Sequence, residues 1–304
     1  MKNRFFPLCV LLAASCGVPH GSPPPSSASA PGRPPSSLRV RWLGGPTTTL
    51  ERGGLRVLTD PMLGSRADNA FVLPKHPSSG AVNAPIARYT LAPPLDVGTL
   101  SAVLISHTHN DHVDAEAKRS LPKSLPVVVA AAGGDALRAA GFVDVRPLDW
   151  GEKLTLRYGA VQLEIVAVPA HHAHDAQLDH DLGRGNGYIL TWKDAAGSLR
   201  AYWTGDAVLS DESRDLATRY GRIDVLLPHL GAVGSDGGLG LRTMNAEETM
   251  TLTARIAPRL VIPIHHTTFG HYREPIVALE QRVAEAGEQK RFRFLAEGET
   301  WDVE

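Results

Sequence analysis

Four apolar segments of this chain, each with the composition of a buried strand, end in side chains that can bind a metal ion. The first, Leu100–Ser106, runs directly into the pattern His-x-His-x-Asp-His. The others lie in LEIVAVPAHHAHD, LRAYWTGDAV and PRLVIPIHHTTF, where the donor residues follow the apolar run. Because active sites are commonly built on loops at the carboxyl edge of packed sheets, the chain is expected to fold around sheets with a site along one edge.

The pattern after the first segment brings together His107, His109, Asp111 and His112. Neutral imidazole and carboxylate groups suit a borderline divalent metal such as zinc, manganese or iron. A polar surface loop is the alternative explanation for any one of these histidines. Since the chain has only 13 histidines among 304 residues, such a dense pattern is hard to obtain by chance, and it predicts a metal site.

Helical stretches alternate with the apolar segments throughout residues 38–304, which we expect to form one large domain. One helix is expected to begin at Asn245 with a capping-box-like start, because Glu248 follows three positions later. Another is expected between Pro275 and Gly287. Two sheets with helices outside them is the architecture that this alternation implies.

The series HTHNDH, PAHH, TGD and IHHTTF, preceded by RWLGG and LTDPMLGSRA, resembles the metallo-β-lactamase-fold hydrolases. Within them it is most similar to the branch that contains N-acyl-phosphatidylethanolamine-hydrolysing phospholipase D and the L-ascorbate 6-phosphate lactonases. The resemblance covers residues 38–304. It implies an α/β fold, the αββα four-layer sandwich, and activity as a metal-dependent hydrolase.

The resemblance also implies seven ligands for two divalent ions, with zinc as the expected metal and manganese or iron as alternatives. His172 is preferred to His171 because the family's Pro-Ala-x-His aligns with it, and His171 stays open as the alternative. The implied ligands are His107, His109 and His172 for one ion, Asp111, His112 and His265 for the other, and Asp206 as the bridge.

The implied mechanism uses a hydroxide held by the two ions, so that no serine or cysteine nucleophile is needed. The expected catalytic residues are Asp111, which orients the hydroxide, Asp206, which fixes the distance between the ions, and His266, a histidine able to protonate the leaving group. The expected substrate is a phosphodiester, phospholipids included. The alternative is a lactone or another ester or amide, and a non-catalytic metal-binding protein is the least favoured reading.

Two departures from this branch fall around the expected substrate rather than around the metals. Residues 44–47 read Gly-Gly-Pro-Thr where relatives often carry Gly-His-Ala-Thr, so that histidine is missing. LLPHLGAVG replaces a phospholipase-like Pro-Ile-Gly-Ala-Tyr and introduces His229. His229 and His266 both follow strands at the expected active edge, which makes them the leading candidates for substrate contacts.

Other conspicuous residues have a structural interpretation. Asp114 is expected to cap a helix that begins at Ala115. Asp60, in LTDP, either orients a ligand histidine or forms a turn, and both readings are open. The aromatic residues of the strand-like segments are expected in sheet and core rather than in a substrate cage: Trp42, Trp192 and Trp203.

The start of the chain has the layout of a signal peptide, with two basic residues before a short apolar stretch. Residues 1–16 are expected to be that signal, with a lipoprotein box that ends at Cys16, and residues 17–37 a disordered Pro- and Ser-rich tether. An exported lipoprotein, periplasmic or at the outer membrane, is therefore expected, with plain secretion as the alternative. A net charge of −1 argues against nucleic acid as a partner and leaves a small molecule or a lipid as the substrate.

Overall fold

The computed structural model describes residues 37–65, 70–73, 84–234 and 240–304, all within one compact unit that spans Pro34–Glu304. The predicted signal peptide and all of the predicted tether except Ser37 lie outside the described residues. Among the described residues, no helix combines the length and the apolar character needed to cross a bilayer.

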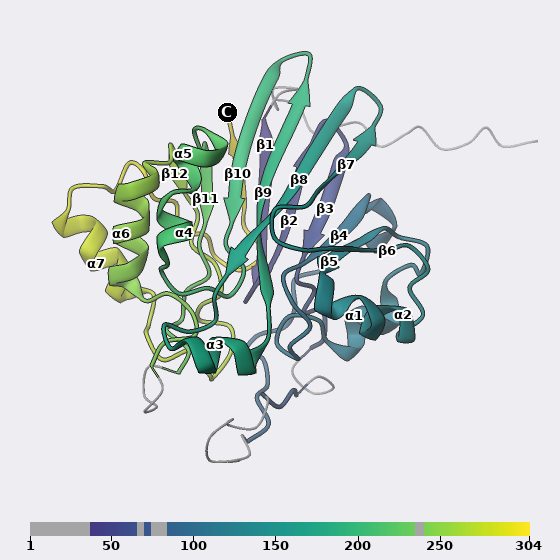
Figure 1. Ribbon diagram of the computed structural model, residues 1–304, viewed down its shortest axis with the longest axis horizontal. Coiled ribbons are helices and arrows are strands. Elements are labelled where there is room, and N and C mark those ends of the chain that lie inside the picture. Colours follow the sequence, from purple (N-terminus) through teal and green to yellow (C-terminus); the bar gives the residue numbers. More distant parts are fainter. Residues whose placement is uncertain (1–36, 66–69, 74–83, 235–239) are drawn as a thin grey trace, which may run out of the picture. The chain divides into compact units, whose positions relative to one another are not determined.

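Two β-sheets form the centre of the unit (Figure 1). One has the strand order β13-β1-β2-β3-β4-β5-β6 and the other the order β12-β11-β10-β9-β8-β7. The strands of the first sheet are β1 (Leu38–Gly44), β2 (Thr47–Arg52), β3 (Leu55–Thr59), β4 (Ala102–Ile105), β5 (Val127–Ala130), β6 (Val145–Leu148) and β13 (Thr300–Val303). Those of the second are β7 (Lys153–Tyr158), β8 (Val161–Ala170), β9 (Gly185–Asp194), β10 (Gly197–Trp203), β11 (Val225–Leu227) and β12 (Leu260–Val261).

Helices lie on the outer faces of both sheets (Figure 1). The α-helices are α1 (Ala115–Ser120), α2 (Gly134–Ala139), α3 (Ala176–Leu182), α4 (Asp211–Arg214), α5 (Leu216–Tyr220), α6 (Ala246–Ile256) and α7 (Val277–Glu285), and the short 3-10 turns are η1 (Val97–Thr99) and η2 (Ala131–Gly133). Apolar residues of α1 and α2 pack on β4 and β5, while those of α6 and α7 pack on the second sheet. The structure is therefore a helix–sheet–sheet–helix sandwich, which confirms the predicted fold class.

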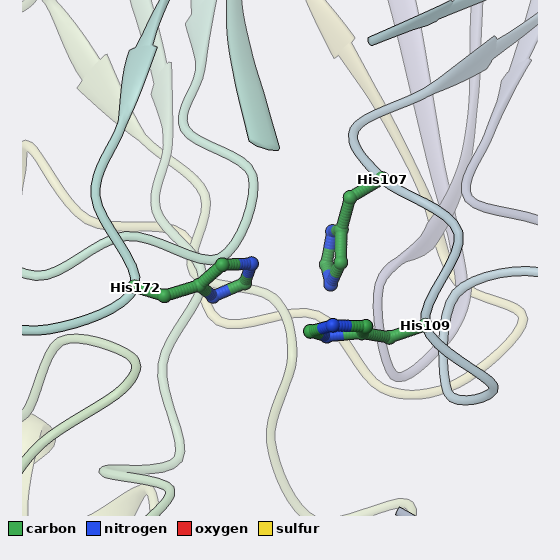
Figure 2. Close-up of side chains that lie close together, drawn as sticks. All are labelled: His107, His109 and His172. Carbon is green, nitrogen blue, oxygen red and sulfur yellow. The ribbon is translucent and has the colours of Figure 1, made fainter. Parts of the chain in front are cut away.

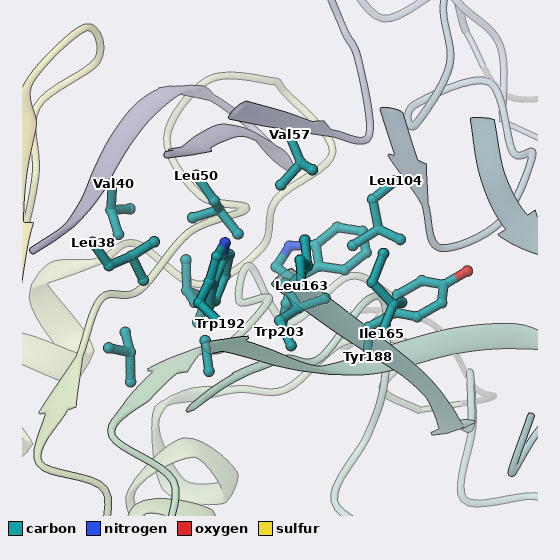
Figure 3. Packing of buried hydrophobic residues seen from close by; sticks show 14 of the residues in the cluster. Leu38, Val40, Leu50, Val57, Leu104, Leu163, Ile165, Tyr188, Trp192 and Trp203 are labelled. Atoms are coloured by element: carbon teal, nitrogen blue, oxygen red, sulfur yellow. The ribbon is translucent and has the colours of Figure 1, made fainter. Parts of the chain in front are cut away.

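The main apolar core fills the space between the two sheets (Figure 3). Trp192 and Trp203 are fully buried there. The ring of Tyr188 stacks on that of Trp203 with 5.8 Å between the ring centroids. Burial of a large apolar side chain contributes about 1.5–3 kcal/mol, so these rings are a major part of what holds the sheets together. The predicted core position of the tryptophans is confirmed, and Trp42 is also buried.

Strand direction explains why the donor residues gather at one edge. β9 runs antiparallel to both β8 and β10, so β8 and β10 run in the same direction, and β11 and β12 are parallel to β10. Their carboxyl ends therefore lie at the same edge of the second sheet. The loops that leave this edge carry His172, Asp206, His229 and His265.

Two predicted helix starts show how local signals work in this chain. The Asp114 side chain accepts a hydrogen bond from the backbone N–H of Ala117 at 2.7 Å, so it caps α1 as expected. Asn245 likewise caps α6 by accepting from the N–H of Glu248. In a capping box the Glu248 side chain would also accept a hydrogen bond from the backbone N–H of Asn245. That part of the expectation is wrong, because Oε1 of Glu248 instead lies 2.5 Å from Nε2 of His174.

Candidate metal centre

Three imidazoles converge on one point from two sheets (Figure 2). His107 and His109 leave the carboxyl end of β4, and His172 follows β8. One nitrogen of each ring lies within 4.8 Å of the corresponding nitrogens of the others, the arrangement expected of ligands around one ion. The structure therefore places His172, and not His171, beside His107 and His109.

A second group lies directly beside the first. It consists of Asp111, His112, Asp206 and His265, whose ligand atoms also lie within 4.8 Å of one another. The ring centroids of His107 and His112 are only 4.0 Å apart, so the two groups adjoin. All seven residues that the sequence singled out as ligands thus fall into two neighbouring clusters that are able to bind metal ions.

The histidines are held in place through the nitrogen that does not face the cluster. The Nδ1 atom of His107 lies 2.9 Å from the Ser106 hydroxyl, and Nδ1 of His265 lies 3.0 Å from the Leu230 carbonyl oxygen. His109 uses its other nitrogen, since Nε2 lies 3.0 Å from the carbonyl oxygen of Leu182. Such contacts fix the orientation of an imidazole and leave the remaining nitrogen free to bind an ion.

Several of the nitrogens and oxygens that face inward have no hydrogen-bond partner among the described residues. These atoms are Nε2 of His107, His172 and His265, and Oδ1 of Asp111. A buried polar atom left without a partner costs about 1–3 kcal/mol, and the cost grows when several such atoms face one another. A divalent cation in each cluster would satisfy these atoms, so the residues present fit metal ions.

The electrostatics of three of the ligand histidines agree with this fit. Burial lowers the pKa of His172 to about 4 and that of His265 to about 3, and it holds the pKa of His107 well below the ordinary value. These imidazoles are neutral at physiological pH, the form that binds a metal. At His112, burial also opposes a charge, but Asp206 and two further carboxylates raise the pKa well above the ordinary value.

Asp60 has a definite role at the second cluster. Its Oδ2 atom accepts from Nδ1 of His112 at 2.6 Å and from the Ser106 hydroxyl at 2.6 Å, while Oδ1 accepts from the Ser106 N–H at 2.7 Å. A carboxylate in this position fixes the His112 ring so that Nε2 faces the cluster. The sequence left open whether Asp60 orients a ligand histidine or forms a turn, and in the structure its side chain orients His112.

A glycine allows the loop after β10 to reach the site. Gly205 has a φ of +61°, and a Cβ atom there would lie 2.5 Å from the Asn186 carbonyl oxygen and 3.0 Å from the Ser106 Cβ. Only a residue without a side chain fits this approach. Gly205 therefore brings Asp206 against the loop that carries the first histidines.

Two histidines proposed from the sequence lie outside both clusters. The ring of His266 packs against Trp42 at a centroid distance of 4.5 Å, and its Nδ1 lies 2.7 Å from the Thr267 hydroxyl. Burial lowers the pKa of His266 to about 4, which leaves it neutral. The structure thus gives His266 an aromatic neighbour rather than a place among the grouped donors, and His171 is paired with Asp179 at 2.7 Å.

Sequence reasoning missed His271. This side chain is buried, and its Nε2 lies 3.4 Å from Oδ2 of Asp111. It also borders a pocket of about 420 Å³ that opens between residues 84–89 and the loop after β12. The signal that could have revealed it is proximity in the chain, since His271 follows His265 in the same loop, but no strand leads directly into it.

Comparison with known proteins agrees with the geometry. A family model described as the Beta-lactamase superfamily domain matches residues 55–266. N-acyl-phosphatidylethanolamine-hydrolyzing phospholipase D 1 of Caenorhabditis elegans is 25% identical over 289 residues, which cover 88% of this chain and 76% of that protein. A metal-dependent hydrolase of Cupriavidus taiwanensis is 29% identical over 278 residues, which cover 86% of this chain and 85% of that protein. The chain spans only 60% of the length of a Mycobacterium tuberculosis protein that it matches at 28% identity over 77% of its own length.

A solved structure shares the fold. The isothiocyanate hydrolase from Delia radicum gut bacteria superposes with a TM-score of 0.70 at 22% identity, over 87% of this chain and 99% of that one. At this identity the likeness speaks for the architecture alone. The match of the family model, which covers both clusters, makes the chain a member of the β-lactamase superfamily.

Proposed function

We propose that this protein is a dinuclear metal-dependent hydrolase that cleaves phosphodiesters, with phospholipid-like molecules as the substrate class. The observation that carries the proposal is the pair of adjoining donor clusters, built by loops that leave both sheets. Two bound ions at such a site supply an activated water and positive charge opposite the phosphoryl oxygens. A single-metal binder needs no second cluster.

The proposed roles of the residues follow from their positions. His107, His109 and His172 would hold one ion, while Asp111, His112 and His265 would hold the other. Asp206, which lies within the second group of donors, would serve both. Asp111 also has an oxygen without a partner among the described residues, which can accept a hydrogen bond from the attacking water and so orient it.

The pocket beside His271 is proposed to hold the organic part of the substrate. Its wall includes Leu73, Pro85 and Ile86, and Arg273 also borders it. A pocket of about 420 Å³ is within the usual size range for a small-molecule site. An apolar wall next to a metal centre favours a substrate with an alkyl chain close to its scissile group, and the name of the nematode relative points to the same class.

A side-by-side assay tests this substrate assignment. The metal-loaded chain is given a chromogenic phosphodiester, a lactone and a β-lactam, with an Asp206→Asn variant as the background. We expect kcat/KM to be highest for the phosphodiester and to fall to background in the variant. Preference for the lactone, with phosphodiester cleavage at background, would move the assignment to lactones while leaving the metal site intact.

A second series tests the pocket. Alkyl 4-nitrophenyl phosphates of increasing chain length should show falling KM with wild-type protein, because each buried methylene contributes about 0.8 kcal/mol. Ile86→Asp should remove this dependence while the shortest ester keeps its turnover. An identical chain-length series in both proteins would contradict the assignment of the pocket.

A further inference from the structure

His229 is a fully buried histidine beside the second donor cluster. Its Nδ1 lies 2.9 Å from Oδ1 of Asp206. An ionised carboxylate offers only acceptors, so Nδ1 is the donor in this hydrogen bond. The other nitrogen, Nε2, has no hydrogen-bond partner among the described residues.

The hydrogen bond determines which oxygen of Asp206 stays available. Oδ1 accepts the hydrogen bond from His229 and lies 3.4 Å from Nε2 of His265, whereas Oδ2 lies 3.1 Å from Nε2 of His112. Rotation of the carboxylate would break the bond to His229 and bury an unpaired charge, which is costly. His229 therefore fixes the plane of the carboxylate and leaves Oδ2 directed at the ligand nitrogen of His112.

His229 is itself firmly held. Its backbone N–H donates to the hydroxyl of Thr204 at 2.9 Å. Its ring stacks on that of His265 at a centroid distance of 5.1 Å and an angle of 7°, and the edge of Trp203 closes another side at 5.2 Å. Since the ring is packed by neighbours, it does not need to be ordered when an ion binds.

Two other roles for His229 fit the contacts less well. A third ion among Asp60, His112 and His229 is disfavoured, because Asp60 lies 2.6 Å from His112, which is a hydrogen-bond distance. Asp60 also accepts two further hydrogen bonds from Ser106. A direct substrate contact, the role expected from the sequence, does not suit a ring with no exposed surface.

We propose that His229 is a positioning residue for Asp206: its Nδ1–H holds one carboxylate oxygen so that the other is presented to the metal position. This inference rests on the proposed metal centre but not on the identity of the substrate. It concerns a feature of this particular chain, because LLPHLGAVG stands where the phospholipase-like pattern has Pro-Ile-Gly-Ala-Tyr, a pattern without a histidine. Hydrogen bonds to a ligating carboxylate commonly change metal affinity about 10- to 100-fold.

Substitution of His229 by asparagine or by glutamine tests the two ring nitrogens one at a time. In His229→Asn the amide nitrogen falls near the position of Nδ1 and can still donate to Asp206. In His229→Gln it falls near the position of Nε2, away from Asp206. His229→Leu removes both nitrogens. We expect the leucine and glutamine variants to bind zinc about 10- to 100-fold more weakly in a competition with a chromogenic chelator, and the asparagine variant to keep most of the wild-type affinity.

Two further measurements and a pair of control variants make the result specific. The visible spectrum of the cobalt-substituted protein should change in His229→Gln and His229→Leu but stay close to wild type in His229→Asn. Thermal unfolding of the metal-free proteins identifies any variant that is destabilised in general. His174→Leu and His174→Asn are matched controls, because His174 also pairs with a carboxylate, that of Glu248, but lies exposed and outside both clusters. Both should bind zinc like wild type.

Wild-type zinc affinity in His229→Gln and His229→Leu would overturn the inference. An asparagine variant as weak as the leucine variant, with equal stability of the metal-free forms, would overturn it as well, since the donor at Nδ1 would then not be the reason. Failure of the proposed function gives a different pattern. The zinc affinities of wild type and of the His229 variants would then differ as expected, but the wild-type protein would cleave no phosphodiester.

Discussion

Asp60 shows at the scale of one residue how the site depends on a side chain that is itself no ligand. Its carboxylate accepts from His112 and twice from Ser106, and it has no exposed surface. Asp60→Asn keeps the size but replaces one acceptor with a donor and removes the charge. We expect about 10- to 100-fold weaker metal binding, measured by chelator competition, because the His112 ring loses its fixed orientation.

Asp114 provides the control for that prediction. It lies near the same loop, but its oxygens accept from the backbone N–H groups of Ala117 and Gly64. Asp114→Ala should lower the free energy of unfolding by about 1–2 kcal/mol and leave the metal affinity unchanged. Equal metal affinity in Asp60→Asn and wild type would show that His112 needs no orienting carboxylate.

At the scale of the elements, an ion pair connects a strand of one sheet to a strand of the other. Arg52, the last residue of β2, donates to Asp194, the last residue of β9, through two hydrogen bonds of 2.7 and 3.0 Å. The hydrogen bond from Arg52 is the main reason why the pKa of Asp194 is lowered from its ordinary value of 3.8. The pair therefore contributes its full stability above that pH and loses it as the pH falls through the lower pKa of the folded state.

The measurement is urea unfolding of Asp194→Asn and wild type over a range of pH. At neutral pH we expect the variant to be less stable by about 2 kcal/mol, the size of a charged hydrogen bond. Below pH 3.8 the difference should shrink as the unfolded chain takes up a proton, and it should be lost below the lower pKa of the folded state, where the wild-type carboxyl is protonated. Asp211→Asn, which breaks an exposed pair with Arg214, should change stability by less than about 0.5 kcal/mol. A difference for Asp194→Asn that is independent of pH would contradict the electrostatic explanation.

The elements also show what the sequence can and cannot reveal. Apolar runs and caps are local signals, so the strands before His107 and His172 and the helix after Asn245 could be predicted. His271 could not, because only the folding of its loop brings it within 3.4 Å of Asp111. The contact between His229 and Asp206 likewise depends on the pairing of β10 with β11, which no local pattern encodes.

At the scale of the whole molecule, we propose that the protein is exported and held at a membrane by a lipid on Cys16. That residue lies outside the described part of the chain, and the proposal rests on the lipoprotein-like AASC. Cys16→Ser should shift the protein from the membrane fraction to the soluble fraction of fractionated cells. Unchanged fractionation of the variant would favour another mode of attachment.

The central claim is that two adjoining clusters bind two metal ions, and elemental analysis of the purified protein tests it most directly. We expect close to two divalent ions per chain. His172→Ala and Asp111→Ala, one from each cluster, should each lower the content, whereas His171→Ala, paired with Asp179 outside the clusters, should not. A chain that contains no metal and gains none when zinc or manganese is added would contradict the account.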